Sequence, residues 1–281
     1  MKIVIDAFGG DNAPVEVIKG TINALKKHES LSVILCGDET KIKDILSDYK
    51  EKILNRIEII HAPEIILNNE SPTMAIKTKV NSSMVACFNK LKEDDDVVAM
   101  ISAGSTGAVL TGGILKIGRI SGVSRPALAP LLPTKKGTQV LLIDCGANVD
   151  CKPINLCHFA LMGSEYVKAL LGKKNPKIAI LNIGTEDKKG NELCKETFDL
   201  LKKLPINFVG NMEARDLLSG DYDIVVSDGF AGNIALKASE GAISLVMNEI
   251  KTSVKKGFFS KIGAAFMIKT FSNMKKKFDY N

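Results

Sequence analysis

The sequence predicts an α/β protein in which a mostly parallel sheet is covered by helices on both faces, in a three-layer, Rossmann-like arrangement. Short apolar runs alternate with helical patterns over roughly the first 230 residues. The runs are apolar at nearly every position, as is typical of strands buried on both faces of a parallel sheet. Glycine-rich polar loops follow several of them, at the place where open α/β sheets bind ligands.

The expected elements alternate along the chain. The strands are, in order, KIVIDAF (2–8), LSVILCG (31–37), IEIIHAP (57–63), VVAMISAG (97–104), QVLLIDCG (139–146), KIAILNIG (177–184) and DIVVSDG (223–229). Helical patterns between them include residues 14–28, 153–172 and 191–204. Two further runs, 127–134 and 207–214, lack an obvious crossover helix, so we expect them to lie antiparallel or to mark the junction of two lobes.

The chain has 281 residues and 45% hydrophobic content, enough to bury a substantial core. We expect residues 1–250 to form the catalytic body, as one domain or two joined lobes. The N-terminus MKIVIDAFGG is too short in apolar residues for a secretory signal. The charge-free stretch VVAMISAGSTGAVLTGG contains too many Gly, Ser and Thr residues for a membrane span. These features predict a cytoplasmic protein.

Positive charge is concentrated at the C-terminal end. Residues 251–281 hold eight lysines and one acid, a net charge of +7, so a total of +6 leaves about −1 for the rest. The segment also holds five of the eleven phenylalanines, and it predicts a basic amphipathic helical hairpin. Such a hairpin suits a dimer interface, an anionic membrane surface or an acidic partner. Nucleic-acid binding is disfavoured because the basic residues accompany apolar aromatics rather than cover a broad face.

Cys145, Cys151, Cys157 and His158 lie close together in the sequence. Zinc ligands usually come in pairs separated by two to four residues, and the five-residue gaps here do not fit that pattern. We therefore expect reduced, buried thiols and no metal site.

The loop Ser102–Gly107 follows a strand that should end at Ile101, and it leads into a helix expected to run through Leu115. Backbone N–H groups at a helix N-terminus favour an anion, so this loop is a candidate phosphate cradle. It matches neither the P-loop nor the dinucleotide motif, and no cofactor is predicted. Many glycine-rich turns serve only to pack a helix tightly onto its sheet, and that alternative stays open.

Further candidates lie in the other strand-end loops. Asp6 and Asp144 end apolar strands, where a carboxylate orients a neighbour or caps a turn. Asn148 and Asn233 carry amides that can donate to an oxyanion. Cations beside the loops suit phosphate contacts. The candidate catalytic residues are Arg125, Asn148, Asn233, Asp144 and Lys152. The candidate phosphate- and substrate-binding residues are Asp6, Gly9, Gly10, Asn12, Ser102, Gly104, Ser105, Thr106, Gly107, Asp228, Gly229 and Lys237.

Seven segments in order across residues 1–241 resemble the bacterial phosphate acyltransferase (PlsX) family. They are DAFGGDNAP, SAGSTGA, SRPALA, DCGANVDCKP, NIGTEDKKGNEL, FVGNMEARD and SDGFAGNIALKASEG. The family usually has Met at the position of Phe8 and often Asn at that of Ser105. It continues past the counterpart of KKKFDYN with a Gly-rich segment and a histidine motif, so we expect the chain to be truncated relative to the family.

The resemblance implies transfer of a fatty acyl group from acyl carrier protein to inorganic phosphate, which gives acyl phosphate for phospholipid synthesis. It also implies a homodimer, a fold similar to phosphate acetyltransferases and to isocitrate and isopropylmalate dehydrogenases, and a downstream membrane glycerol-phosphate acyltransferase as partner. An acyl phosphate is a poor solute, so peripheral membrane association is expected, with Phe258, Phe259, Ile262 and Phe266 as membrane contacts.

The mechanism expected from these residues needs no covalent enzyme nucleophile. Phosphate is itself a nucleophile, and a thiol with a pKa near 8.5 leaves with little acid assistance. The three histidines form no recognisable Ser-His-Asp or Cys-His arrangement. We expect the strand-end loops to share one pocket. The alternatives are a short-chain phosphotransacylase that uses coenzyme A, a metal-dependent dehydrogenase using Asp221, Asp223 and Asp228, and a non-catalytic scaffold that recruits acyl carrier protein.

Overall fold

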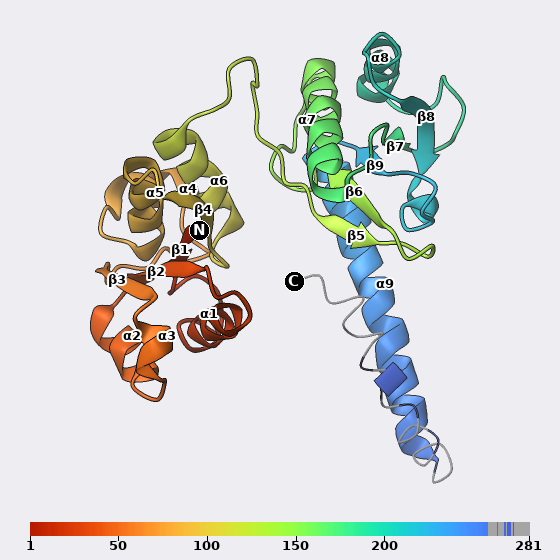
Figure 1. Cartoon of the computed structure of the whole chain (residues 1–281). Coiled ribbons are helices and arrows are strands. Elements are labelled where there is room, and N and C mark those ends of the chain that lie inside the picture. The colour runs from red at the N-terminus through yellow and green to blue at the C-terminus, as the bar shows by residue number, and fades with distance from the viewer. Residues whose placement is uncertain (258–262, 264–266, 268, 271, 273–281) are drawn as a thin grey trace. The chain divides into compact units, whose positions relative to one another are not determined.

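The computed structural model describes residues 1–257, 263, 267, 269–270 and 272. The chain divides into two compact units, Met1–Gly122 (unit 1) and Val123–Asn281 (unit 2). Figure 1 shows unit 1 in red to yellow and unit 2 in green to blue. Each unit has its own sheet and its own core.

Unit 1 contains a four-stranded, fully parallel sheet. Its order is β3 (Ile57–His61), β2 (Ser32–Gly37), β1 (Lys2–Asp6) and β4 (Val97–Ile101). Its helices are α1 (Val15–Lys27), α2 (Glu39–Leu46), α3 (Glu51–Leu54), α4 (Pro72–Thr78), α5 (Ser83–Glu93) and α6 (Thr106–Gly112), and α6 continues into the π-helix η1 (Gly113–Ile117).

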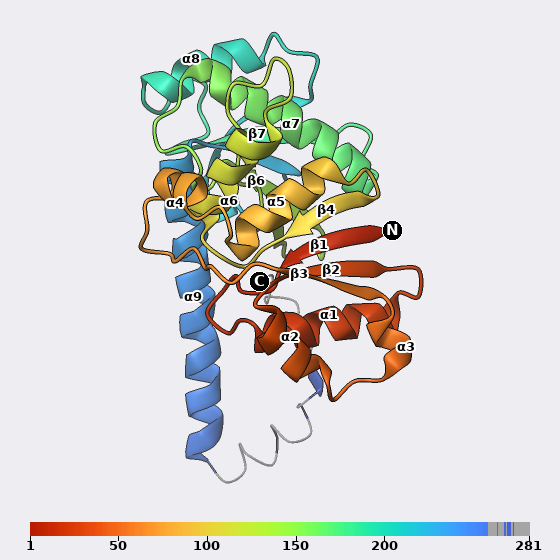
Figure 2. The same cartoon turned by 90° about the vertical axis from the view of Figure 1, so that its left-hand side faces the viewer.

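The sheet of unit 1 lies between two helical layers (Figure 2). Residues Ile18, Ile22 and Leu25 of α1 pack with Val33 and Leu35 of β2 on one face. On the other face, Cys87 of α5 packs against Val4, Ile34 and Cys36. Because alternate strand residues point to opposite faces, both layers exclude water from the central strands, and the runs are apolar throughout.

Unit 2 contains a five-stranded sheet in the order β5 (Leu131–Pro133), β6 (Gln139–Ile143), β9 (Ile224–Val226), β7 (Ile178–Asn182) and β8 (Phe208–Glu213). Only β5 is antiparallel to its neighbour. Helices α7 (Pro153–Leu171) and α8 (Glu192–Leu201) pack on one face around Phe159 and Phe198. The first turns of α9 (Gly229–Lys256) cover the other face through Ala235 and Leu236, and the 3₁₀ turn η2 (Ala214–Asp216) follows β8.

The structure confirms the predicted α/β class and all seven predicted strands. Of the two runs without an obvious crossover, 127–134 contains β5 and is antiparallel, as expected. The antiparallel expectation is wrong for 207–214, because β8 is parallel to β7. The reason is that α8, inside the predicted helix 191–204, is itself the crossover between these two strands.

Helix α9 runs without a break through residue 250, where the predicted catalytic body ends. The predicted membrane contacts Phe258, Phe259, Ile262 and Phe266 lie outside the described residues, as does most of the second half of the predicted hairpin, and these stay predictions. Among the helices that the structure describes, none has the length and apolar composition needed to cross a bilayer.

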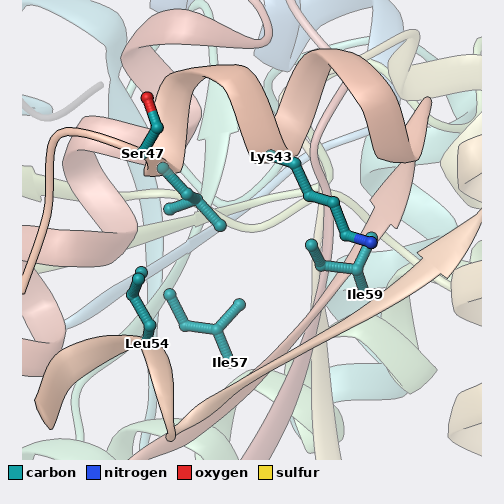
Figure 3. A pocket seen from close by; sticks show the side chains of 6 residues that line it. Lys43, Ser47, Leu54, Ile57 and Ile59 are labelled. Carbon is teal, nitrogen blue, oxygen red and sulfur yellow. The ribbon is translucent and has the colours of Figure 1, made fainter. Parts of the chain in front are cut away.

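Unit 1 carries a shallow apolar hollow of about 220 Å³, lined by Lys43, Leu46, Ser47, Leu54, Ile57 and Ile59 (Figure 3). Its one cation, Lys43, is paired with Glu39 at 2.6 Å. The hollow lies beside the beginning of β3, whereas ligands of open α/β sheets bind beyond the ends of the strands. The ends of the strands, rather than this hollow, are therefore the expected place of the functional site.

Candidate active site

In unit 1, the predicted polar loops meet beyond the ends of β1 and β4. These two strands are neighbours, while the chain leaves β1 to form β2 on the other side. The strand order thus reverses between β1 and β4, which makes this the crevice where open α/β sheets bind ligands. Strand β4 ends at Ile101, as predicted, and Ser102 follows it directly.

The carboxylate of Asp6 organises the two loops of this crevice. Asp6 is 2% exposed, and its Oδ2 accepts a hydrogen bond from Ser102 Oγ at 2.7 Å. Ser102 Oγ in turn accepts from the backbone N–H of Gly104 at 3.1 Å, and Asp6 Oδ1 accepts from the N–H of Phe8 at 3.3 Å. A carboxyl group removed from water needs such hydrogen-bond donors, because burying it without them is costly. Asp6 therefore fixes both loops at once.

Gly9 and Gly10 allow the first loop to touch the second. A Cβ on Gly9 would lie 2.6 Å from Asp6 Oδ2 and 2.8 Å from the nitrogen of Gly104. Gly10 has a φ of 102°, a conformation that favours glycine, and it faces the backbone of Ala103. Only glycine lets the two backbones approach this closely.

The remaining candidates of unit 1 divide between two roles. Ser105 caps α6, because its Oγ accepts from the N–H of Ala108 at 3.4 Å. A Cβ on Gly107 would lie 2.9 Å from Pro72 Cγ, so this glycine serves the packing of α6 against α4. Gly107 thus has the packing role that glycines of such turns often have, while Gly9 and Gly104 lie in the contact between the two loops. Asn12 is exposed, and Thr106 is the first residue of α6.

In unit 2, Asp144 has the role that Asp6 has in unit 1. It directly follows β6, is completely buried, and accepts five hydrogen bonds. Its donors are the backbone N–H groups of Leu128 at 2.9 Å, Cys145 at 2.8 Å, Ala147 at 3.2 Å and Asn148 at 2.7 Å, and the Asn148 amide Nδ2 at 2.9 Å. No face of this carboxylate meets solvent, so Asp144 is placed to position the loop rather than to touch a substrate.

Asn148 joins the loop after β6 to the loop after β9. Its Nδ2 donates to both Asp144 Oδ2 at 2.9 Å and the carbonyl of Pro126 at 2.8 Å. Both amide hydrogens are therefore engaged, and donation to an oxyanion would require one of these bonds to break. Its own carbonyl accepts from the N–H of Gly229 at 2.8 Å, where a Cβ would lie 2.7 Å from that oxygen.

Asp228 and Asn233 occupy the beginning of α9. Asp228 caps the helix by accepting from the N–H of Ala231 at 2.7 Å. Asn233 is exposed, and its carboxamide carbon lies 3.8 Å from the position of a Cβ on Gly146, in the loop after β6. Within the described part of the chain, the side chain of Asn233 has no hydrogen-bond partner, which leaves both of its N–H groups free to donate.

Two cations stand on adjoining segments of unit 2. The exposed Arg125 donates from Nη1 to the carbonyl of Asp150 at 2.5 Å. The N–H of Lys152 donates to Asn155 Oδ1 at 2.8 Å, and Asn155 Nδ2 donates to Ser124 Oγ at 2.9 Å. The buried Asn155 therefore ties the side chain of Ser124, the neighbour of Arg125, to the backbone of Lys152.

The other charged candidates are engaged elsewhere. Lys237, in α9, pairs with Glu240 at 2.8 Å. Asp221 pairs with Lys136, Asp223 pairs with Lys173, and Asp228 caps α9. Over the residues that the structure describes, no three acidic, thiol or imidazole side chains gather as metal ligands would.

The cysteines of unit 2 are poor nucleophiles. Burial, followed by the charge of Asp144, raises the pKa of the Cys145 thiol to about 12 and that of the Cys151 thiol to about 11. Burial likewise raises the pKa of Cys157 and Cys194. Because the thiolate is the reactive form, these side chains stay neutral at physiological pH.

Comparison with known proteins decides the family. A model of the family described as fatty acid synthesis protein matches residues 1–281. The chain is 47% identical over 281 residues to the phosphate acyltransferase of Bacillus licheniformis, with 100% of this chain and 83% of the relative covered. It is 46% identical over 280 residues to the phosphate acyltransferase of Clostridium novyi, again covering 83% of the relative. The chain belongs to the phosphate acyltransferase family.

Membership of the phosphate acyltransferase family makes the protein an acyltransferase and confirms the resemblance seen in the seven sequence segments. Solved structures confirm the fold class. A phosphotransacetylase from Staphylococcus aureus superposes with a TM-score of 0.62 at 19% identity, covering 87% of this chain and 82% of that one. One from Streptococcus pyogenes gives a TM-score of 0.61 at 17% identity, covering 86% and 82%.

Within each unit of this phosphate acyltransferase family member, the structure brings predicted residues together. Asp6, Gly9, Ser102 and Gly104 meet in unit 1. In unit 2, Asp144, Asn148 and Gly229 are linked by hydrogen bonds. That loops of both units share one pocket stays a prediction.

Sequence reasoning missed Asn155, Ser124 and Ser227. Asn155 is the third residue of α7, and a polar residue at this position of a helix is a recognisable capping signal. Ser227 donates to the carbonyl of Asp144 at 2.8 Å. Ser227 could have been recognised in the sequence from its position next to Asp228, at the end of an apolar strand.

The raised pKa of Cys151 leads to a labelling prediction. A pKa of about 11 leaves the thiol protonated at neutral pH, so iodoacetamide should modify Cys151 about 300-fold more slowly than an ordinary thiol of pKa 8.5. The rate should rise about tenfold per pH unit as pH approaches the pKa, because the thiolate fraction rises by that factor.

Peptide mass spectrometry after timed labelling measures this rate, with N-acetylcysteine in the same mixture as the ordinary thiol and Cys151→Ala as the assignment control. If Cys151 is labelled as fast as the free thiol at about pH 7, its side chain is a thiolate. Cys151 would then become a candidate nucleophile for covalent catalysis.

Proposed function

We propose that the enzyme transfers a fatty acyl group from acyl carrier protein to inorganic phosphate and releases acyl phosphate for phospholipid synthesis. The observation that carries the proposal is the pair of cations, Arg125 and Lys152, on adjoining segments beside the loop that Asp144 holds. A guanidinium and an ammonium suit a phosphate dianion, and family membership supports phosphate as the acceptor.

Each step has a candidate residue. In the proposal, Arg125 and Lys152 neutralise phosphate and lower the repulsion as its oxygen approaches the thioester carbon. As the tetrahedral intermediate forms, its oxyanion accepts a hydrogen bond from Asn233, whose amide hydrogens are not engaged within the described residues. The carbon–sulfur bond then breaks, and the thiolate leaves with the electron pair. A thiol pKa near 8.5 makes this departure possible without a strong general acid.

Asp144 and Asn148 act as positioning residues in this scheme. They hold the loop between β6 and α7, from which Lys152 emerges and to which Arg125 is tied. In unit 1, the backbone N–H groups of residues 104–107, Asp6 and Gly9 form a second candidate element for phosphate or substrate binding.

We further propose a homodimer that rests peripherally on anionic membranes and delivers its product to a membrane glycerol-phosphate acyltransferase. Support comes from the eight lysines and five phenylalanines of residues 251–281. Flotation at low salt with anionic and neutral vesicles tests the membrane part, and equal recovery with both kinds of vesicle would reject it. Light scattering of the purified chain tests the dimer, and a monomer mass at micromolar concentration would reject it.

The activity itself is tested by trapping acyl phosphate with hydroxylamine. Long-chain acyl carrier protein thioester plus phosphate should yield hydroxamate, and omission of phosphate should abolish it. The same assay with acetyl coenzyme A separates the coenzyme A-dependent alternative, which would prefer that short-chain thioester. Hydroxamate from neither substrate would contradict the proposal.

Arg125→Ala should lower kcat/KM for acyl phosphate formation by about 100-fold or more, as removal of a donor to developing charge typically does. The side chain is exposed and makes one hydrogen bond to the described residues, so the far-ultraviolet circular dichroism spectrum should not change. Arg215→Ala is the matched control, because Arg215 lies in the same unit and pairs only with Glu213 and Asp216 among the described residues. Near-normal turnover of Arg125→Ala would refute its assignment.

A further inference from the structure

Unit 2 contains a groove whose lining includes Asp228 but otherwise consists of residues outside the candidate set. It has a volume of about 430 Å³ and lies beyond the ends of three neighbouring strands, β6, β9 and β7. Its wall comes from the loop after β6, the start of α8 and the start of α9. This volume is within the range of pockets that hold small organic ligands, roughly 300–1,000 Å³.

Three of the seven residues that line the groove have apolar side chains. Val149 and Phe230 line it and remain 59% and 61% exposed, and Leu193 adds a third apolar wall. The thiol of Cys151, also in the lining, donates to the carbonyl of Asn148 at 3.4 Å and remains neutral because burial raises its pKa. Exposed apolar side chains on loops at a ligand-binding sheet edge indicate a surface that a ligand covers.

The charged residues that line the groove disfavour an anion as its occupant. Both ionisable carboxyl groups in the lining, Asp150 and Asp228, would repel one. Each of the two helices that begin at the groove already has one N–H group of its first turn capped by a side chain. Asn191 Oδ1 accepts from the N–H of Cys194 at 2.9 Å, and Asp228 Oδ1 accepts from that of Ala231 at 2.7 Å. The groove therefore suits a neutral, apolar ligand.

Arg125 stands beside this groove. Its guanidinium donates to the carbonyl of Asp150, one of the lining residues. A cation for phosphate and an apolar groove thus adjoin each other, as the two reactants of an acyl transfer to phosphate require. The thioester carbon would lie between them.

We propose that this groove binds the alkyl chain of the acyl thioester, in the part next to the carbonyl. The inference rests on the proposed function for the identity of the ligand. The groove then distinguishes chain lengths by the number of methylene groups that it buries. Each buried methylene group should lower the dissociation constant of the thioester about fourfold until the groove is full.

The test compares two thioesters, S-butyryl-pantetheine and S-decanoyl-pantetheine, titrated calorimetrically into the full chain without phosphate. The wild type should bind the decanoyl thioester at least about tenfold more tightly. Val149→Trp, which fills the groove, should lower the decanoyl-to-butyryl affinity ratio by at least about tenfold. Phe230→Ser, which removes an apolar wall, should lower the same ratio and serves as the second variant if Val149→Trp does not fold.

Val209→Trp is the matched control, because Val209 lies on β8 of the same unit, is 45% exposed and is not part of the lining. It should keep the wild-type ratio. An unchanged ratio in both groove variants, or equal binding of the two thioesters by the wild type, overturns the inference.

Hydroxamate trapping on the same wild-type preparation keeps the two proposals apart. If acyl phosphate forms but the decanoyl-to-butyryl affinity ratio is unchanged in the groove variants, only the proposal about the groove is rejected. A lowered ratio without any acyl phosphate formation supports the groove and rejects the proposed function.

Discussion

A buried carboxylate at the end of a central strand determines the shape of the loops in both units. Asp6 and Asp144 are 2% and 0% exposed, and each accepts hydrogen bonds from the loop that follows its own strand and from a second segment. An ionised carboxylate removed from water requires such donors, so the loops fold around it. Glycines then allow the close approach, as Gly9 does in unit 1 and Gly229 in unit 2.

In unit 2, the loop held by Asp144 positions the residues of the proposed mechanism. The loop that Asp144 holds begins at the end of β6 and ends at Lys152, and Arg125 is tied to it through the carbonyl of Asp150. Lys152 thus lies on a loop whose backbone is fixed by the buried Asp144, and Arg125 is hydrogen-bonded to that loop from an adjoining segment. Because Asn148 uses both amide hydrogens inside this framework, the proposed mechanism assigns donation to the developing charge to Asn233.

Much of the fold was predictable because the physical signals were local. Strand β4 ends at Ile101 and β6 at Ile143, where apolar runs give way to polar residues. The position of β8 was not predictable in this way, because strand direction depends on which helix serves as the crossover. The role of Gly107 depends on Pro72, which is distant in sequence, and the engagement of Asn148 depends on Pro126. Such contacts are long-range, and one sequence does not reveal them.

Hydrogen–deuterium exchange of Asp144→Asn tests most directly whether the carboxylate holds the loop. In this variant an amide NH₂ replaces one acceptor oxygen, and each lost hydrogen bond costs about 1–3 kcal/mol, or roughly tenfold in exchange rate. The remaining oxygen can still accept from Leu128, Cys145 and Ala147, so the NH₂ group faces the N–H of Asn148. The amide of Asn148 should therefore exchange at least about tenfold faster, while that of Leu142, bonded to Pro130 within the sheet region, should keep its protection. Wild-type protection of the Asn148 amide in the variant would contradict the account.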